Sequence, residues 1–102
     1  MAERVKIAER AEVREGTGKV VVSGGRVLAL FNVGGSYFAV DNTCPHRGGP
    51  LGEGQLAGTV VTCPWHGWQF DVCSGSSPHN PNATVRRVPL DLQGDDIFAL
   101  LD

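Results

Sequence analysis

The sequence predicts an all-β protein. Three features support this prediction: short segments rich in β-branched residues, polar and apolar side chains that alternate within several of them, and Gly-rich turns between them. Residues 4–8 alternate as a half-buried strand does, and residues 19–23 are rich in valine. The charged stretch 9–15 is too short for a stable helix, so we expect a turn or a single helical turn there.

Glycine pairs predict tight turns between consecutive strands. Gly24-Gly25 precedes an expected strand at 26–33, and Gly34-Gly35 joins that strand to a return strand at 37–40 as a two-residue hairpin connection. Residues 19–40 should therefore form an antiparallel meander, a rigid base from which functional loops project. Further strands are expected at 59–62, 68–72, 84–92 and 96–101, the last two joined by a turn at 93–95.

Length and composition fit one small domain spanning residues 1–102, with 41% hydrophobic residues. A chain of this size buries roughly two thirds of its unfolded surface. The net charge of −2 gives no basic footprint for nucleic acid. The longest apolar run, 27–31, is too short to cross a bilayer, and the polar Glu3 and Arg4 argue against a signal peptide. We therefore expect no nucleic-acid partner, no membrane and a cytoplasmic location.

Two short boxes contain the chemistry. Cys44-x-His46 and Cys63-x-x-His66 each supply one thiolate and one imidazole, and sixteen residues lie between the boxes. Side chains two or three positions apart can approach one metal centre together, so the pattern predicts metal ligation. Neither box lies in a helical pattern, so we expect the ligands on loops between strands.

The residues around the boxes suit ligand loops. Pro45 and Pro64 follow the two cysteines, and each fixes φ at a turn. Gly48, Gly49 and Gly67 follow the histidines, where a loop around a compact inorganic group needs close backbone approach or a positive φ. Structural zinc modules usually pair cysteine with cysteine, or histidine with histidine, within each box. Here both boxes are mixed.

With these two boxes the chain resembles the Rieske 2Fe–2S family. The resemblance is specific within residues 41–75 and looser outside them. It implies that Cys44 and Cys63 bind one iron and that His46 and His66 bind the other. It also implies a Rieske fold: an antiparallel β-sandwich or barrel base carrying a small cluster-binding subdomain of two ligand loops, at about residues 42–75.

The resemblance implies one cluster per chain and one-electron chemistry. With two thiolates and two neutral histidines the oxidised cluster is neutral, and reduction gives it a single negative charge. An all-cysteine cluster starts more negative, so mixed ligation raises the potential. The four protein ligands leave no open position for a substrate. We therefore expect an electron carrier and not an enzyme.

Two redox systems within the family remain open as partners. A Rieske-type ferredoxin would accept an electron from an NAD(P)H-dependent reductase and deliver it to a terminal oxygenase of an aromatic-ring dioxygenase system. The alternative is the small subunit of assimilatory NAD(P)H nitrite reductase, with that enzyme's large subunit as its partner. A hypothesis of another class is a structural Cys2His2 zinc module for protein binding.

Other residues have secondary interpretations. Cys73 is predicted to be a free thiol at a strand-to-turn junction, and His79 to be a surface residue. Pro78 or Pro81 could cover the cluster in a third loop, because Rieske proteins commonly place a proline-containing loop there. The exposed loop residues expected to contact redox partners are Arg47, Glu53, Gln55 and Trp65. High-potential relatives carry disulfide cysteines where this chain has Gly49 and Trp65, and hydroxyl donors where it has Trp68 and Phe70, so the resemblance implies a low potential.

Overall fold

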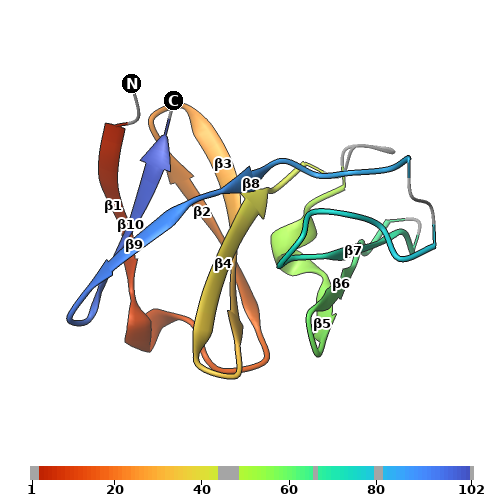
Figure 1. The fold of residues 1–102 in the computed structure, drawn as a ribbon, viewed down its shortest axis with the longest axis horizontal. Coiled ribbons are helices and arrows are strands. Elements are labelled where there is room, and N and C mark those ends of the chain that lie inside the picture. Colours follow the sequence, from red (N-terminus) through yellow and green to blue (C-terminus); the bar gives the residue numbers. More distant parts are fainter. Residues whose placement is uncertain (1–2, 44–48, 66, 80–81, 102) are drawn as a thin grey trace.

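The computed structural model describes residues 3–43, 49–65, 67–79 and 82–101. Within these residues the strands form three antiparallel sheets (Figure 1). The closing sheet has the order β1 (Glu3–Glu9), β10 (Asp96–Leu101), β9 (Leu90–Gln93). The central sheet has the order β2 (Gly18–Ser23), β3 (Arg26–Val33), β4 (Ser36–Asp41), β8 (Arg87–Val88). The loop sheet has the order β5 (Gln55–Ala57), β6 (Val60–Thr62), β7 (Gln69–Asp71).

The predicted meander is confirmed, and its turns are where the glycines place them. In the β2–β3 hairpin, Gly24 and Gly25 have φ values of 58° and 78°. In the β3–β4 hairpin, Gly34 and Gly35 have φ values of 59° and 93°. Positive φ at both central positions matches the right-handed twist of the flanking strands. The charged stretch after β1 forms a single 3₁₀ turn, η1 (Arg10–Glu12), and a second, η2 (Leu51–Glu53), precedes β5.

One predicted strand is wrong in its extent. Residues 84–92 do not form a continuous strand, because Pro89 separates β8 from β9. Proline has no N–H to donate to a ladder, so it marks the point where pairing changes. β8 pairs with β4 in the central sheet, whereas β9 pairs with β10 in the closing sheet.

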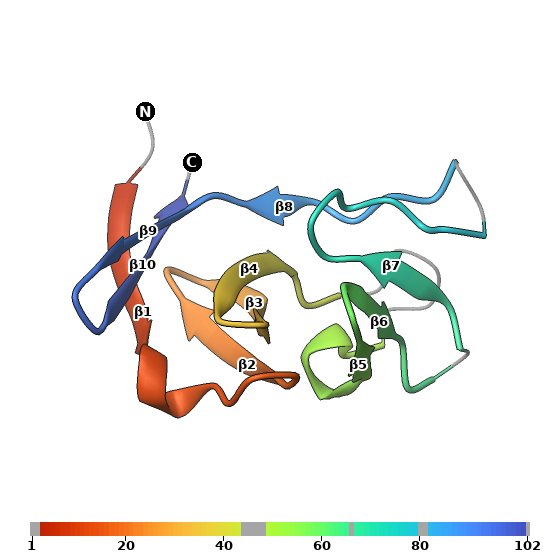
Figure 2. The same ribbon diagram turned by 60° about the horizontal axis from the view of Figure 1, so that its bottom comes forward.

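The central sheet is covered on both faces (Figure 2). Successive residues of a strand point to opposite sides, and β3 shows the consequence. Leu28 and Leu30 pack in one core with residues of β10, and Ala29 and Phe31 pack in a second core with residues of β6 and β7. This double burial explains the apolar residues 28–31, whereas Val27 at the start of the run is exposed. It also fixes the loop sheet, which carries the second ligand box, against a rigid base.

No helix in the described part of the chain is long and apolar enough to span a membrane.

Candidate metal-cluster site

The first ligand loop leaves β4 and is closed at its base. Thr43 and Pro50 form an isolated antiparallel bridge on either side of the first box. The buried side chain of Asn42 accepts a hydrogen bond from the backbone N–H of Gly52 at 2.7 Å. The backbone N–H of Leu51 donates to the carbonyl of the same asparagine at 2.7 Å. Asn42 therefore ties the chain entering the loop to the chain leaving it.

The second ligand loop lies between β6 and β7. The N–H of Cys63 donates to the carbonyl of Trp68 at 2.7 Å, and the N–H of Gly67 donates to the carbonyl of Cys63 at 3.1 Å. Gly67 has a φ of 74°, as the sequence predicted for a glycine after this box. Cys63 directly follows the last residue of β6, and it is buried, with a relative exposure of 1%. The loop thus turns a thiol inward.

Gly49 links the two ligand loops. A Cβ at Gly49 would lie 2.6 Å from Cys63 Sγ, 3.0 Å from Trp65 Cγ and 3.2 Å from Trp65 Cβ. Its φ is outside the left-handed region, so close approach and not backbone conformation requires glycine here. The prediction of close backbone approach at this glycine is confirmed. The backbone after the first box therefore packs directly on the sulfur of the second.

An open cavity of about 440 Å³ lies between Glu53, Gly54 and Gln55 on one side and the residues Thr62, Cys63, Pro64 and Gly67 on the other. A buried thiol with side-chain-free backbone against its sulfur fits an inorganic cluster with thiolate ligation. Of the four predicted ligands, Cys63 is the one the structure describes. Cys44, His46 and His66 lie outside the described residues, as do Arg47 and Gly48.

The third cysteine has the position that the sequence predicted. Cys73 is a free, half-buried thiol in the turn after β7. The Asp71 carboxylate accepts hydrogen bonds from the N–H of Cys73 at 2.8 Å and of Ser74 at 3.3 Å, which shapes the turn. Burial, and then the Asp71 carboxylate, raise the pKa of the Cys73 thiol. A thiol held neutral in this way is a poor metal ligand or nucleophile.

Aromatic residues near the second box differ in exposure. Trp65 is 58% exposed, as expected for a partner contact, whereas Trp68 packs against the core beside Phe70, with ring centroids 6.5 Å apart. His79 is exposed, as predicted, but its Nε2 lies 2.6 Å from Gln69 Oε1, a contact that sequence reasoning missed. Pro78 is exposed, and Pro81 lies outside the described residues.

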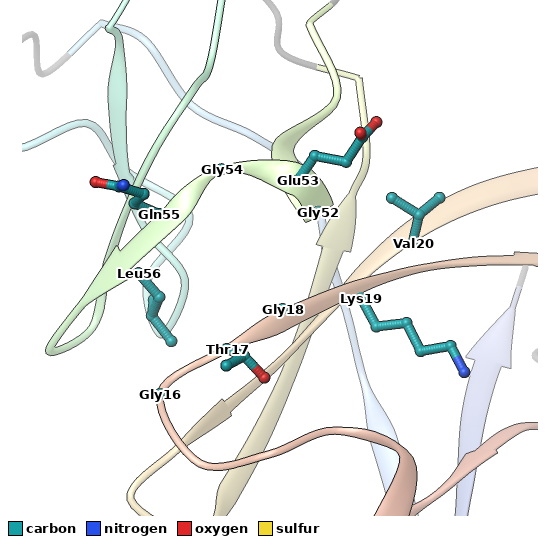
Figure 3. A pocket seen from close by; sticks show the side chains of 10 residues that line it. All are labelled: Gly16, Thr17, Gly18, Lys19, Val20, Gly52, Glu53, Gly54, Gln55 and Leu56. Atoms are coloured by element: carbon teal, nitrogen blue, oxygen red, sulfur yellow. The ribbon is translucent and has the colours of Figure 1, made fainter.

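A larger groove of about 770 Å³ separates the start of β2 from η2 and β5 (Figure 3). Packing explains two of the glycines that line it, Gly18 and Gly52. A Cβ at Gly18 would meet the Phe31 ring at 2.5 Å, and one at Gly52 would meet Val20 at 2.6 Å. Lys19 points out of the groove (Figure 3). Its Nζ forms an ion pair with Glu12 Oε1 at 2.7 Å. We interpret this groove as the seam between the central sheet and the first ligand loop.

An all-β base with a buried thiol, in a sequence that contains two mixed Cys/His boxes, is typical of an iron–sulfur electron carrier. The model of the Rieske [2Fe-2S] domain matches residues 3–89, so the chain belongs to the Rieske family, and its cofactor is a Rieske-type 2Fe–2S cluster. When bound, this group takes up and releases a single electron. The chain itself is a carrier of electrons and not an enzyme.

Relatives and solved structures agree with this assignment. The ferredoxin component of the naphthalene 1,2-dioxygenase system of Pseudomonas aeruginosa is 33% identical over 88 residues, covering 85% of each chain. A chain in the complex of reduced oxygenase and oxidized ferredoxin in carbazole 1,9a-dioxygenase superposes with a TM-score of 0.86 at 27% identity, covering 95% of this chain and 92% of the other. The putative NADH-dependent nitrite reductase small subunit of Mycobacterium tuberculosis shares the fold alone, with a TM-score of 0.90 at 23% identity over 100% and 97%.

Proposed function

We propose that this chain takes one electron from an NAD(P)H-dependent reductase and delivers it to a terminal oxygenase. The observation that carries the proposal is the relative from a dioxygenase system, which is 33% identical over 85% of each chain. The similar chain in an oxygenase–ferredoxin complex supports the same partner class. An NAD(P)H-dependent donor also favours a cytoplasmic location.

Cys44 and Cys63 would bind one iron, and His46 and His66 the other. The close contact between Gly49 and Cys63 Sγ supports this ligand set, because it brings the backbone that follows the first box to the sulfur of the second. The bridge between Thr43 and Pro50 closes the first loop around its box. We treat residues 1–102 as a single domain whose cluster-binding subdomain covers about residues 42–75.

Partner contacts are proposed at the exposed residues of the ligand loops. Trp65, Glu53 and Gln55 are exposed and lie around the cavity beside Cys63 or next to it in the loop. An exposed tryptophan beside a redox centre offers a large apolar contact, and Trp is enriched in the energetically important parts of interfaces. Arg47 belongs to the same loops by sequence.

The nitrite reductase small subunit remains the second candidate. Its support is a likeness of fold at 23% identity, which does not distinguish the redox system. The third hypothesis, a structural zinc module, is no longer supported, because the model of the Rieske [2Fe-2S] domain matches residues 3–89.

Single substitutions test the ligand set. Cys44→Ser, Cys63→Ser, His46→Ala and His66→Ala should each abolish the visible chromophore or make it labile, because the cluster loses a ligand. Cys73→Ser is the matched control and should leave absorption unchanged. Iron and sulfide analysis of each protein gives the cluster content. A stable, unaltered chromophore in one of the four variants would remove that residue from the set.

Reconstitution separates the two partner classes. The reduced protein is mixed with a terminal oxygenase or with a nitrite reductase large subunit, and its reoxidation is followed by stopped-flow absorbance. We expect fast, salt-dependent reoxidation with the oxygenase. Turnover with the nitrite reductase alone would favour the second candidate.

A further inference from the structure

A short chain of polar side chains lies at the base of the second ligand loop. Thr62 ends β6 and Gln69 begins β7, and they are direct cross-strand partners. Gln69 Nε2 donates to Thr62 Oγ1 at 3.2 Å. These two residues bracket the loop that contains Cys63, so the bond between them closes the loop's base together with the backbone bond from Cys63 to Trp68.

His79 extends this chain from a distant part of the sequence. Its Nε2 lies 2.6 Å from Gln69 Oε1, a short distance for an N–H···O bond. A carbonyl oxygen can only accept, so Nε2 carries the proton and donates.

The backbone brings His79 to this position. The N–H of Asp71 donates to the carbonyl of Ser76 at 2.8 Å, and the N–H of Ser77 donates to the carbonyl of Ala83 at 3.0 Å. The segment after β7 thus folds back along the end of the loop sheet. Between it and the second ligand loop an open cavity of about 260 Å³ remains, bordered by Gly67, Gln69 and His79. Gln69 and His79 both border this open space, so the bond between them joins the two segments where the cavity leaves them apart.

We propose that His79 is a positioning residue for the second ligand loop. Through Gln69 and Thr62 it holds the segment after β7 against the loop that carries Cys63, and so restrains the loop around the cluster. The inference rests on the proposed ligand set. His79 is not a metal ligand in this proposal. Its polar bridge to Gln69 and Thr62 is a part of the site that lies outside the two ligand boxes.

The test compares variants of the cluster-loaded protein. Amide hydrogen exchange is measured at Cys63 and Gly67, whose N–H groups bond within the loop, and the chromophore is followed during a chelator challenge. One hydrogen bond between uncharged groups corresponds to about a fivefold change in an equilibrium. His79→Ala should therefore speed exchange at both amides, and loss of the chromophore, by about fivefold. His79→Gln keeps a side-chain N–H donor and should restore both rates to within twofold of wild type.

Two further variants separate the bridge from a general loss of order. Thr84→Ala changes an exposed side chain in the same segment after β7 and should leave both rates unchanged. Gln69→Ala already breaks the bridge, so adding His79→Ala to it should have no further effect. Exchange at Phe31 of the central sheet is the internal reference and should be the same in every variant.

The proposal is overturned by unaltered rates in His79→Ala, by additive effects in the double variant, or by failure of His79→Gln to restore them. Failure of the ligand set has a different signature. If Cys63→Ser kept its chromophore, the proposed ligands would be wrong, while amide exchange would still report whether the bridge restrains the loop.

Discussion

Replacing Gly49 by alanine should disrupt the site through one added methyl group. The new Cβ would lie 2.6 Å from Cys63 Sγ, about 1 Å closer than an ordinary contact between such atoms. Trp65 Cβ, at 3.2 Å, cannot move without the backbone, and Trp65 Cγ, at 3.0 Å, can move only if the large indole ring swings about χ1. Overpacking of this kind costs about 2 kcal/mol. For a chain of this length that cost lowers Tm by roughly 10 °C.

The sulfur is the atom with freedom to yield, by rotation about χ1 of Cys63. We therefore expect Gly49→Ala to alter or bleach the visible chromophore as well as to lower Tm. Far-UV circular dichroism gives the unfolding temperature, and visible absorption and circular dichroism report on the cluster.

Gly58→Ala is the matched control. Gly58 lies in the turn between β5 and β6, has a φ of 62°, and has no atom within 4 Å of the position of a Cβ apart from its chain neighbours. An alanine there is strained by about 1–2 kcal/mol without touching the sulfur. It should lower Tm and leave the chromophore spectrum unchanged. A Gly49→Ala protein with wild-type Tm and spectrum would refute the argument that backbone must approach the sulfur closely.

Other predictions concern the surroundings of the site. Asn42→Ala leaves the buried N–H of Gly52 without its acceptor and should lower the free energy of unfolding by about 1–3 kcal/mol in urea titration, with Asn42→Asp recovering part of the loss. The pKa of the Cys73 thiol is raised above 9.0 in the folded protein. Its contribution to stability is therefore full below that pH and is lost as the pH rises through the folded pKa. Cys73→Ser should accordingly flatten the fall in stability at alkaline pH. Wild-type-like alkaline behaviour of that variant would contradict this. The midpoint potential should lie at about −150 mV and be independent of pH around pH 7, because Trp68 and Phe70 supply no hydroxyl donor. Protein-film voltammetry measures it, and a potential above zero or a steep dependence on pH would contradict the prediction.

Local signals predicted most of the base. Glycine pairs at 24–25 and 34–35 set the hairpins, and the meander between them follows from short-range chemistry. β5 was missed because its three residues, between Gly54 and Gly58, have no pattern of their own and are a strand through pairing with β6. The division of residues 84–92 at Pro89 has the same origin, since two different sheets compete for the two halves.

The candidate site was also predicted in part from the sequence and in part missed. The boxes name candidate ligands because thiolates and imidazoles at short spacing have few other uses. Sequence also pointed to the glycines at 49 and 67, each of which meets one of the two predicted requirements. The bond from His79 to Gln69 was beyond sequence reasoning, since it depends on how the segment after β7 folds back. His79 alone resembles any exposed histidine.

The pairing of β1 with β10 has a consequence for how the protein can be attached to other things. Glu3 and Leu101 are Cα partners, so both ends of the described chain leave the molecule together. In Figure 1 they lie at the opposite end of the long axis from β5, β6 and β7, and that axis measures 35 Å. A tether to an electrode or a fused reductase at either end would therefore leave the face beside Cys63 pointing outward. Linking the two ends and opening the β2–β3 hairpin should give a circularly permuted carrier whose ligand loops are untouched.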